Sequence, residues 1–449
     1  MTESLALEIR QGVPGEVTAG LFDLDGRSVI LIRADTPTRM GALTPEDGKT
    51  IANALEMALA KRLPAILLLA SSGADANHGV AALHGWGTAA RVLSKCSGVI
   101  PVIAAVTGPA VSGTALLIGL ADIVVMTESA YAFVSGPIPV RQMTGVQISQ
   151  QELGGSDVHH RETGVASIIV SDDEVLQTIA EILQFFPNYN GLEAPRIATN
   201  DLDGRLTPEA SDVLPETPSG SYDVREIIRH IADDNYFVEL RSGWATNLVT
   251  GLASFGGRSV GVVANQPISI AGTLDIPASQ KGARFVAMCD AFNLPLITLV
   301  DTPGFYPGKD LEWRGMIRHG AQLAFAYARA TVPRIALVLR KSYGGAYIVM
   351  DSKTIGNDAY LAWPTAEIAV MGATQAAQIL RRGASDAEIE EYVAEYDSTY
   401  LNPYIGAERG FVDAVIDPKL TRRELIDLLD LLSTKKEKNP VRRHDNSPL

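Results

Sequence analysis

The sequence predicts an α/β chain that contains two copies of one domain. Apolar runs typical of buried strands alternate with segments of helical periodicity. The tetrapeptide Gly26-Arg27-Ser28-Val29 recurs as Gly257-Arg258-Ser259-Val260, 231 positions later. A glycine turn that includes Gly113 recurs at Gly345, 232 positions later. A repeat of this length has the size of a whole domain, so the chain is predicted to be duplicated.

Two further landmarks keep the same spacing and locate the domains. Pro64 and Gly73 match Pro295 and Gly304, again 231 positions apart. The polar, proline-bearing stretch from Asn200 to Ser221 is typical of a linker. We therefore predict domains at residues 1–215 and 216–449.

The first copy starts with strand-like segments and a well-marked helix. Thr44 is suited to cap that helix, and Pro45 suits its first position because a missing N–H costs nothing there. Ile51, Leu55 and Leu59 are spaced by four and give the helix an apolar face. The predicted elements are strands around a turn at Asp25-Gly26 within 15–33, a helix at 45–62, a strand at 64–70, a helix at 80–93, a strand at 101–106, a turn and helix from 108, a strand at 123–126 and a segment at 130–136.

The stretch from Ser342 to Ala346 is the most informative part of the second copy. It follows the apolar run 333–339, which predicts a buried strand, and it precedes Ile348-Val349-Met350, where a helix can start. A strand, a glycine turn and a helix start present backbone N–H groups that have no partner within the helix. Such groups bind anions or stabilise an oxyanion. The run 101–106 and the turn 108–114 repeat the pattern, so two oxyanion holes are predicted.

Composition excludes several classes of protein. The chain has 449 residues and a net charge of −14, which argues against broad affinity for nucleic acids or membranes. No apolar stretch approaches the roughly 20 residues of a membrane span, and no secretory signal is visible. We expect a cytoplasmic protein. Its two cysteines, Cys96 and Cys289, are expected to be buried free thiols.

The side chains offer little other chemistry. Asp157, His159 and His160 are metal ligands by type, but no two histidines are four residues apart, so no metal is expected. Ser112 is either a nucleophile or a structural serine in a tight turn, and the G-x-S-x-G elbow is missing. No G-x-G-x-x-G dinucleotide fingerprint is present at 256–261. Arg318 and His319 are either solvated or in contact with a ligand at the second turn.

Six motifs stand out in the second half. They are Ala264-Asn265-Gln266-Pro267, the run 287–293, Val300-Asp301-Thr302-Pro303-Gly304-Phe305, the run 317–321, Tyr343-Gly344-Gly345-Ala346-Tyr347 and the run 362–373. Together they resemble the carboxyltransferase (beta) subunit of biotin-dependent acyl-CoA carboxylases, of the propionyl- and acetyl-CoA type. The resemblance implies two crotonase-type domains, each a β-β-α superhelix, with the acyl-CoA side in the first domain and the carboxybiotin side in the second.

The resemblance also implies a reaction and its residues. A carboxyl group moves from carboxybiotin, carried on a partner biotin carboxylase or carrier subunit, to the α-carbon of a short- or medium-chain acyl-CoA. The chain has no Met-Lys-Met biotinylation motif, so biotin is expected on the partner, and no metal is implied. The family assembles as a hexamer, here of one or two subunit types, with each site between two neighbouring subunits. The implied residues are Gly344, Gly345 and Ala346 at the biotin hole, Ser112 and Gly113 at the thioester hole, and Gly73, Ala74, Tyr347, Ile348, Gly372 and Ala373 around the substrate.

The first half departs from the family pattern at two places. Asp75 stands where the family commonly has arginine, and Ser112 stands where it commonly has glycine. These changes motivate a second hypothesis, a non-catalytic or partner-dependent beta subunit in a mixed complex. A third is another crotonase-fold CoA enzyme, such as a decarboxylase or a hydratase. Ile348 lies where the family selects acyl length, and its apolar side chain suits acetyl or longer chains unless it is simply part of the core.

Overall fold

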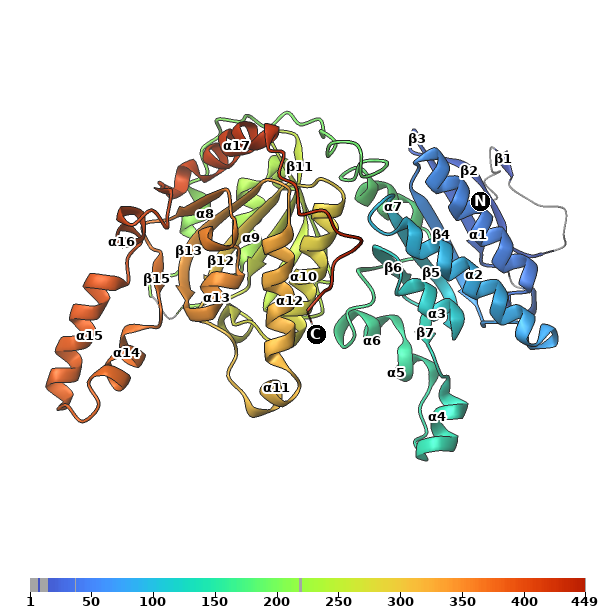
Figure 1. Ribbon diagram of the computed structural model, residues 1–449, viewed down its shortest axis with the longest axis horizontal. Coiled ribbons are helices and arrows are strands. Elements are labelled where there is room, and N and C mark those ends of the chain that lie inside the picture. Colours follow the sequence, from blue (N-terminus) through green and yellow to red (C-terminus); the bar gives the residue numbers. More distant parts are fainter. Residues whose placement is uncertain (1–6, 9–14, 37, 218–219, 449) are drawn as a thin grey trace. The chain divides into compact units, whose positions relative to one another are not determined.

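The chain forms two compact units in a computed structural model, and each is described by itself (Figure 1). The structure describes residues 7–8, 15–36, 38–217 and 220–448. One unit comprises Met1–Glu193 with Arg241–Trp244, and the other comprises Ala194–Leu240 with Ala245–Leu449. The expected boundary at residue 215 therefore lies inside the second unit.

The first unit is built on an eight-stranded sheet in the described part of the chain. Its order is β1-β2-β3-β4-β5-β6-β8, and β7 pairs with β5. β1, β2 and β3 pair antiparallel, and the remaining pairs are parallel. The strands are β1 (Leu7–Glu8), β2 (Thr18–Leu24), β3 (Arg27–Ala34), β4 (Ala65–Ser71), β5 (Val102–Val111), β6 (Ile123–Thr127), β7 (Tyr131–Phe133) and β8 (Ile168–Val170).

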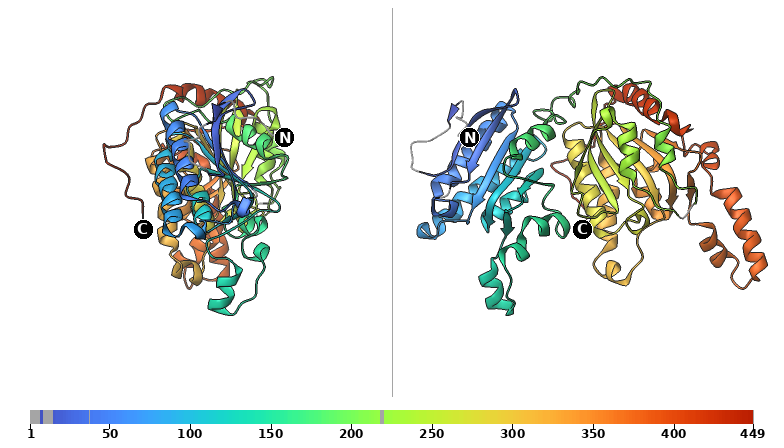
Figure 2. Two further views of the ribbon diagram at one scale, coloured as in Figure 1. Left: turned by 90° about the vertical axis from the view of Figure 1, so that its right-hand side faces the viewer. Right: turned by 180° about the vertical axis from the view of Figure 1, so that it is seen from behind.

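Helices of the first unit follow the strands in the expected order. α1 and α2 lie side by side on one face of the sheet (Figures 1 and 2), and their apolar faces share one buried core with it. The helices are α1 (Pro45–Lys61), α2 (Val80–Cys96), α3 (Gly113–Ile118), α4 (Pro137–Thr144), α5 (Gln150–Gly154), α6 (Ser156–Arg161) and α7 (Val175–Leu183).

The second unit repeats this sheet. Its order is β16-β14-β13-β12-β11-β10-β9, and β15 pairs with β13 as β7 pairs with β5. The predicted duplication is thus confirmed strand by strand. The strands are β9 (Phe237–Leu240), β10 (Leu248–Phe255), β11 (Arg258–Asn265), β12 (Leu296–Thr302), β13 (Arg334–Tyr343), β14 (Ala359–Ala362), β15 (Glu367–Ala369) and β16 (Ala414–Val415).

Helices cover both faces of the second sheet. α10 and α12 lie on one face, and α9 and α17 bury isoleucine and leucine side chains against the other. α14 and α15 project away from the sheet as a pair (Figure 1). The helices are α8 (Glu209–Asp212), α9 (Val224–Ile231), α10 (Ile276–Ala291), α11 (Lys309–Trp313), α12 (Met316–Arg329), α13 (Gly344–Val349), α14 (Ala373–Leu380), α15 (Asp386–Tyr400), α16 (Pro403–Glu408) and α17 (Thr421–Leu431).

The described residues of the segment 200–221 belong to the second unit rather than forming a free linker. Thr207 is fully buried, and its N–H donates to the Lys419 carbonyl at 2.8 Å. Arg205 pairs with Asp201 at 2.7 Å and also donates to the His230 carbonyl. Polar composition suggested a linker, but these polar groups are satisfied by other parts of the same unit.

Local signals predicted the first helix well. α1 has a capping box in which the Thr44 side chain accepts from Asp47 N–H and the Asp47 carboxylate accepts from Thr44 N–H. Pro45 occupies its first turn, and Ile51 and Leu55 are completely buried. Among the described residues, no helix combines the length and the apolar content needed to cross a bilayer.

The predicted turns are shorter than expected. β5 continues through Val111 and β13 continues through Tyr343, because each gains a short parallel partner, β7 or β15. The stretch 108–111, which was expected to be part of a turn, is therefore strand, and α13 starts at Gly344 rather than near Ile348. The partner strands β7 and β15 come later in the chain, so the local composition, which is typical of a turn, did not indicate that β5 and β13 would be extended.

Candidate active site

Each unit presents one sharp turn from a strand into a short helix. β5 leads through Ser112 into α3, and β13 leads directly into α13 at Gly344. The two turns occupy equivalent places in the repeat. In both, the residue after the strand has a positive φ, +58° at Ser112 and +59° at Gly344. The first N–H groups of each helix have no carbonyl partner within the helix.

Backbone hydrogen bonds show which N–H groups at the first turn already have a partner. Ser112 N–H donates to the Phe133 carbonyl of β7 at 2.9 Å. Leu116 N–H donates to the Ser112 carbonyl at 3.2 Å and is the first within α3 to reach back. The N–H groups before Leu116 in α3, those of Gly113, Thr114 and Ala115, therefore have no carbonyl partner of this kind, whereas the Ser112 N–H is engaged in the sheet. Ser112 itself is exposed.

The first turn is surrounded by groups that leave room only for glycine. A Cβ at Gly113 would meet the Trp86 ring at 2.8 Å. Gly73 has a φ of +103°, and a Cβ there would lie 3.0 Å from the Val111 carbonyl oxygen and 3.5 Å from Ser112 Cβ. The structure thus brings Gly73 beside the turn that contains Ser112 and Gly113. Ala74 is half-buried and pairs with Leu43 in an isolated bridge.

Asp75 is negative where the family pattern has a positive side chain, but its charge is paired within the unit. It caps the short 3₁₀ helix Ala76–His78 by accepting from Asn77 N–H at 2.9 Å. Arg39 Nη1 lies 3.1 Å from its other oxygen. The hydrogen bond from Asn77 and the nearby Arg39 charge hold the pKa of Asp75 below its usual value. The carboxylate is buried and paired with a cation of the same unit.

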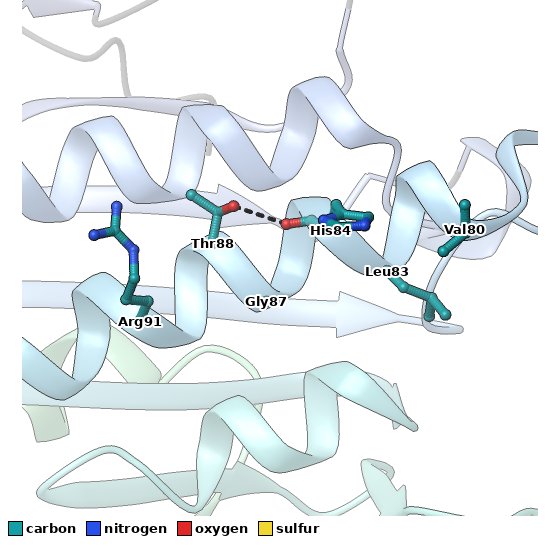
Figure 3. Close-up of a pocket in the computed structure, with 6 residues that line it drawn as sticks. All are labelled: Val80, Leu83, His84, Gly87, Thr88 and Arg91. Atoms are coloured by element: carbon teal, nitrogen blue, oxygen red, sulfur yellow. Dashed lines mark hydrogen bonds between the residues drawn. The ribbon is translucent and has the colours of Figure 1, made fainter.

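A shallow groove follows the outer side of α2, the helix that carries Trp86 (Figure 3). Its volume is about 330 Å³. Thr88 Oγ1 donates to the His84 carbonyl at 2.8 Å, so that hydroxyl is used within the helix. Val80 and Leu83 lie at one end of the groove and Arg91 at the other. The groove is lined by Val80, Leu83, His84, Gly87, Thr88 and Arg91.

The second turn leaves more space around its donors. Gly345 is exposed, and a Cβ there would make ordinary contact with Phe305 at 3.5 Å. A Cβ at Gly344 would come to 3.2 Å from the Val370 carbonyl oxygen, in a backbone conformation that favours glycine. Ala346 is completely buried, so its side chain anchors α13 while its N–H lies in the first helical turn.

The residues after the second turn divide into exposed and packed positions. Ile348 is 44% exposed, so it is not a core residue. The Tyr347 ring packs edge-on against Tyr360 with centroids 5.9 Å apart. Gly372 precedes α14, and a Cβ there would lie 3.5 Å from the Tyr343 ring. Ala373 is the first residue of α14 and is buried.

Other candidate groups do not assemble into a site. Asp157 pairs with Arg161 at 2.6 Å, and the His159 ring contacts the Ala132 carbonyl at 2.8 Å. Within the described ranges, no group of three potential ligands that could hold a metal is present. His319 is buried between Gln280 and Gln322, at 3.3 and 3.2 Å from its Nδ1, whereas Arg318 is exposed.

Sequence reasoning missed two aromatic side chains that shape the turns, Trp86 and Phe305. Phe305 follows Gly304 and lies 231 positions after Ala74. The repeat therefore indicated that Phe305 is equivalent to a residue already predicted to lie near the substrate. No comparable signal marked Trp86, because its contact with Gly113 depends on how α2 packs beside α3.

Comparisons with known proteins agree with this architecture. The carboxyl transferase domain model matches residues 4–447. The propionyl-CoA carboxylase beta chain of Roseobacter denitrificans is 39% identical over 437 residues, covering 96% of this chain and 86% of that protein. The methylmalonyl-CoA decarboxylase alpha subunit of Propionigenium modestum is 38% identical, covering 98% and 87%. The crystal structure of the transcarboxylase 12S hexamer with hydrolysed methylmalonyl-CoA has a TM-score of 0.95 and 38% identity, covering 98% of this chain and 90% of that one.

Two crotonase-like units in one chain define the class, which is that of the carboxyltransferases of biotin-dependent carboxylases. The chain belongs to the carboxyl transferase domain family, and it is an enzyme of the acyl-CoA carboxylase carboxyltransferase type. The predicted family and the predicted crotonase-type fold are both confirmed.

Proposed function

We propose that this chain transfers a carboxyl group between carboxybiotin on a partner protein and the α-carbon of a short- or medium-chain acyl-CoA. The observation that supports the proposal most directly is the pair of matched turns, at Ser112 and at Gly344. Each turn presents helix N–H donors, and the reaction develops negative charge on two oxygens. Removing a donor of this kind typically costs about 2.7–4 kcal/mol in the transition state.

In this proposal the second unit serves biotin. The N–H groups of Gly345 and Ala346 would donate to the ureido oxygen, and exposed Gly345 beside Phe305 leaves space for a flat ring. When bound, biotin would supply the carboxyl group and, as the anion left after its release, the base for the α-proton. Gly344 provides the backbone conformation that aims the two donors.

The first unit serves the thioester. Gly113 N–H is its principal donor, because the Ser112 N–H is engaged with Phe133. We assign to the substrate the surfaces of Gly73 and Ala74 beside this donor, together with Tyr347, Gly372 and Ala373 beside the second turn. Ile348 is exposed and apolar, which suits an acyl chain that is not restricted to propionyl.

The assembly that we propose is a homo- or hetero-hexamer with a biotin carboxylase and carrier partner. The 12S protein of the solved transcarboxylase assembles as a hexamer. Each site would then combine the first unit of one subunit with the second unit of its neighbour. A partner-dependent beta subunit in a mixed complex stays the alternative, because Ser112 and Asp75 depart from the family pattern.

A second candidate is a decarboxylase subunit, which the similarity to the methylmalonyl-CoA decarboxylase alpha subunit favours. The chain's own step would be the same, a transfer between a malonyl-type thioester and biotin. Only the later fate of carboxybiotin on the partner would differ.

The test is the reverse reaction of the purified chain. Malonyl-, methylmalonyl- and ethylmalonyl-CoA are each supplied with free biotin, and the release of the shorter acyl-CoA is followed. We expect turnover that requires biotin. Biotin-independent release would favour another crotonase-fold enzyme, and no turnover by a folded oligomer would favour a partner-dependent subunit.

A further inference from the structure

A buried charged network lies just before the turn of the second unit. Asp301, at the end of β12, is 1% exposed. Its Oδ2 accepts from the Tyr222 hydroxyl at 2.9 Å and from Arg340 Nε at 3.1 Å. Its Oδ1 accepts from the Lys341 N–H at 3.1 Å. Arg340 also donates to the Gly220 carbonyl at 2.7 Å, so the network ties β12 and β13 to the segment before α9.

The network coincides with an irregularity in the sheet. Val300 pairs with Val338 and Thr302 pairs with Ser342, so Asp301 faces an enlarged stretch of β13. Gly344, the first residue of the turn, comes three residues after Lys341. At this irregularity the Asp301 carboxylate, rather than a backbone carbonyl of β12, accepts the hydrogen bond from the Lys341 N–H.

The first unit has the same irregularity, but the equivalent residues are uncharged. Leu69 pairs with Val106 and Ser71 pairs with Ala110. Ala70 then occupies the place of Asp301, and Gly108 and Pro109 occupy those of Arg340 and Lys341. Pro109 has no N–H to satisfy, so no acceptor is needed there.

Comparison of the two units shows that the bulge alone does not require a buried ion pair. Burial of a carboxylate is unfavourable, and it raises the pKa of Asp301 although Arg340 and the Lys341 N–H oppose the shift. Buried ion pairs contribute little net stability relative to apolar side chains of similar volume. The charged version occurs in the unit to which we assign biotin, which suggests a role at that turn.

We propose that Asp301, Arg340 and Tyr222 are positioning residues that fix the path of β13 into the Gly344–Ala346 turn and so the aim of its N–H donors. This inference rests on the proposed function. None of the three is placed in contact with substrate. A displacement of reacting groups by about 1 Å can cost about 100-fold in rate, so a small change in this path is expected to matter.

The test compares Asp301→Asn with a matched control, Asp233→Asn. Asp233 is also 1% exposed, pairs with the buried Arg422 at 2.6 Å and accepts from the N–H groups of Gly256 and Gly257. It lies at the β10–β11 hairpin, the opposite end of the strands from the turn. Thermal unfolding and steady-state kinetics of methylmalonyl-CoA with free biotin are measured for both, at a temperature where both are folded.

We expect both variants to unfold at lower temperature and only one to lose catalysis. Asp301→Asn should lower kcat/KM for biotin about 10-fold or more, with the KM for the acyl-CoA within about two-fold of wild type. Asp233→Asn should keep both values within about two-fold. Equal kinetics of the two variants would overturn the positioning role.

Tyr222→Phe gives a second variant if Asp301→Asn does not fold. It removes one hydrogen bond to the carboxylate and leaves the ion pair, so a smaller loss of about three-fold in kcat/KM for biotin is expected. Wild-type kinetics in this variant would overturn the inference. A wild-type chain without biotin-dependent turnover would instead overturn the proposed function, and this inference with it.

Discussion

Ser112 and Gly344 occupy equivalent positions in the two units and have nearly the same φ, +58° and +59°. The second unit meets this requirement with glycine, which adopts positive φ freely. The first unit meets it with serine, whose ψ of −114° places it outside the regions that L-residues prefer. A strained residue therefore lies at the turn where we place the thioester.

Ser112→Gly is expected to stabilise the first unit. Relief of the strain should outweigh the added flexibility of glycine and raise the free energy of unfolding by about 1 kcal/mol. For a unit of this size that corresponds to a rise of about 2–4 °C in the unfolding temperature. Differential scanning calorimetry measures it, with Ser112→Ala as the control that keeps the Cβ and should show no rise. A fall in Ser112→Gly would contradict the strain argument.

The same variant also tests the partner-dependent alternative. If Ser112 impairs the thioester site, Ser112→Gly should gain biotin-dependent turnover that the wild-type chain lacks. Equal biotin-dependent turnover by the wild-type chain and the variant would show that the serine is compatible with catalysis.

Gly345→Val is expected to abolish biotin-dependent turnover while the chain folds normally. The exposed position leaves space for a Cβ at ordinary contact with Phe305, but a branched side chain would fill the proposed ureido site. Gly345→Ala is the graded control and should retain part of the activity. Turnover is measured with methylmalonyl-CoA and biotin, and folding by circular dichroism. Full activity of the valine variant would place biotin elsewhere.

Ile348→Asp is expected to change acyl preference more than stability. The side chain is 44% exposed, so a carboxylate there stays partly solvated. Loss of the apolar wall should lower kcat/KM for ethylmalonyl-CoA relative to methylmalonyl-CoA by about 10-fold, the typical effect of one methylene group. Ile348→Val keeps the wall and serves as the control. Parallel changes for both substrates would remove Ile348 from the acyl site.

Both cysteines are expected to be unreactive in the native protein. Cys96 and Cys289 are completely buried, and both are free thiols. Burial, with the nearby Asp122 charge, raises the pKa of Cys96 to about 12, and burial raises that of Cys289 well above its usual value. A thiol reagent at pH 8 should label neither cysteine in the native protein and both in denaturant. Rapid native labelling would indicate local opening of α2 or α10.

Much of the fold was predictable because its signals are local. The capping box at Thr44 and the apolar runs of β4 and β12 depend on neighbours in the chain. The constant spacing between the copies revealed the duplication. The lengths of β5 and β13 were not predictable in this way, since they depend on pairing with β7 and β15.

The site was predictable only in part. The two glycine turns, which recur at the same spacing as the rest of the repeat, led to the proposed positions of the N–H donors. The sequence did not indicate that the Ser112 N–H would bind Phe133, or that Trp86 would lie against Gly113. Both contacts join segments that are distant along the chain.

The sequence by itself determined the α/β elements, the family and the two turns, because periodicity, turn chemistry and motifs depend on residues close together in the chain. The duplication was also determined by the sequence, through landmarks that recur at a constant spacing. Tertiary structure alone decided that the Ser112 N–H is engaged by the Phe133 carbonyl and that Ile348 is exposed. It also decided that Asp301 is joined to Arg340 before only one of the two turns. These features depend on the pairing of distant strands, which brings together groups whose separation in the sequence carries no signal.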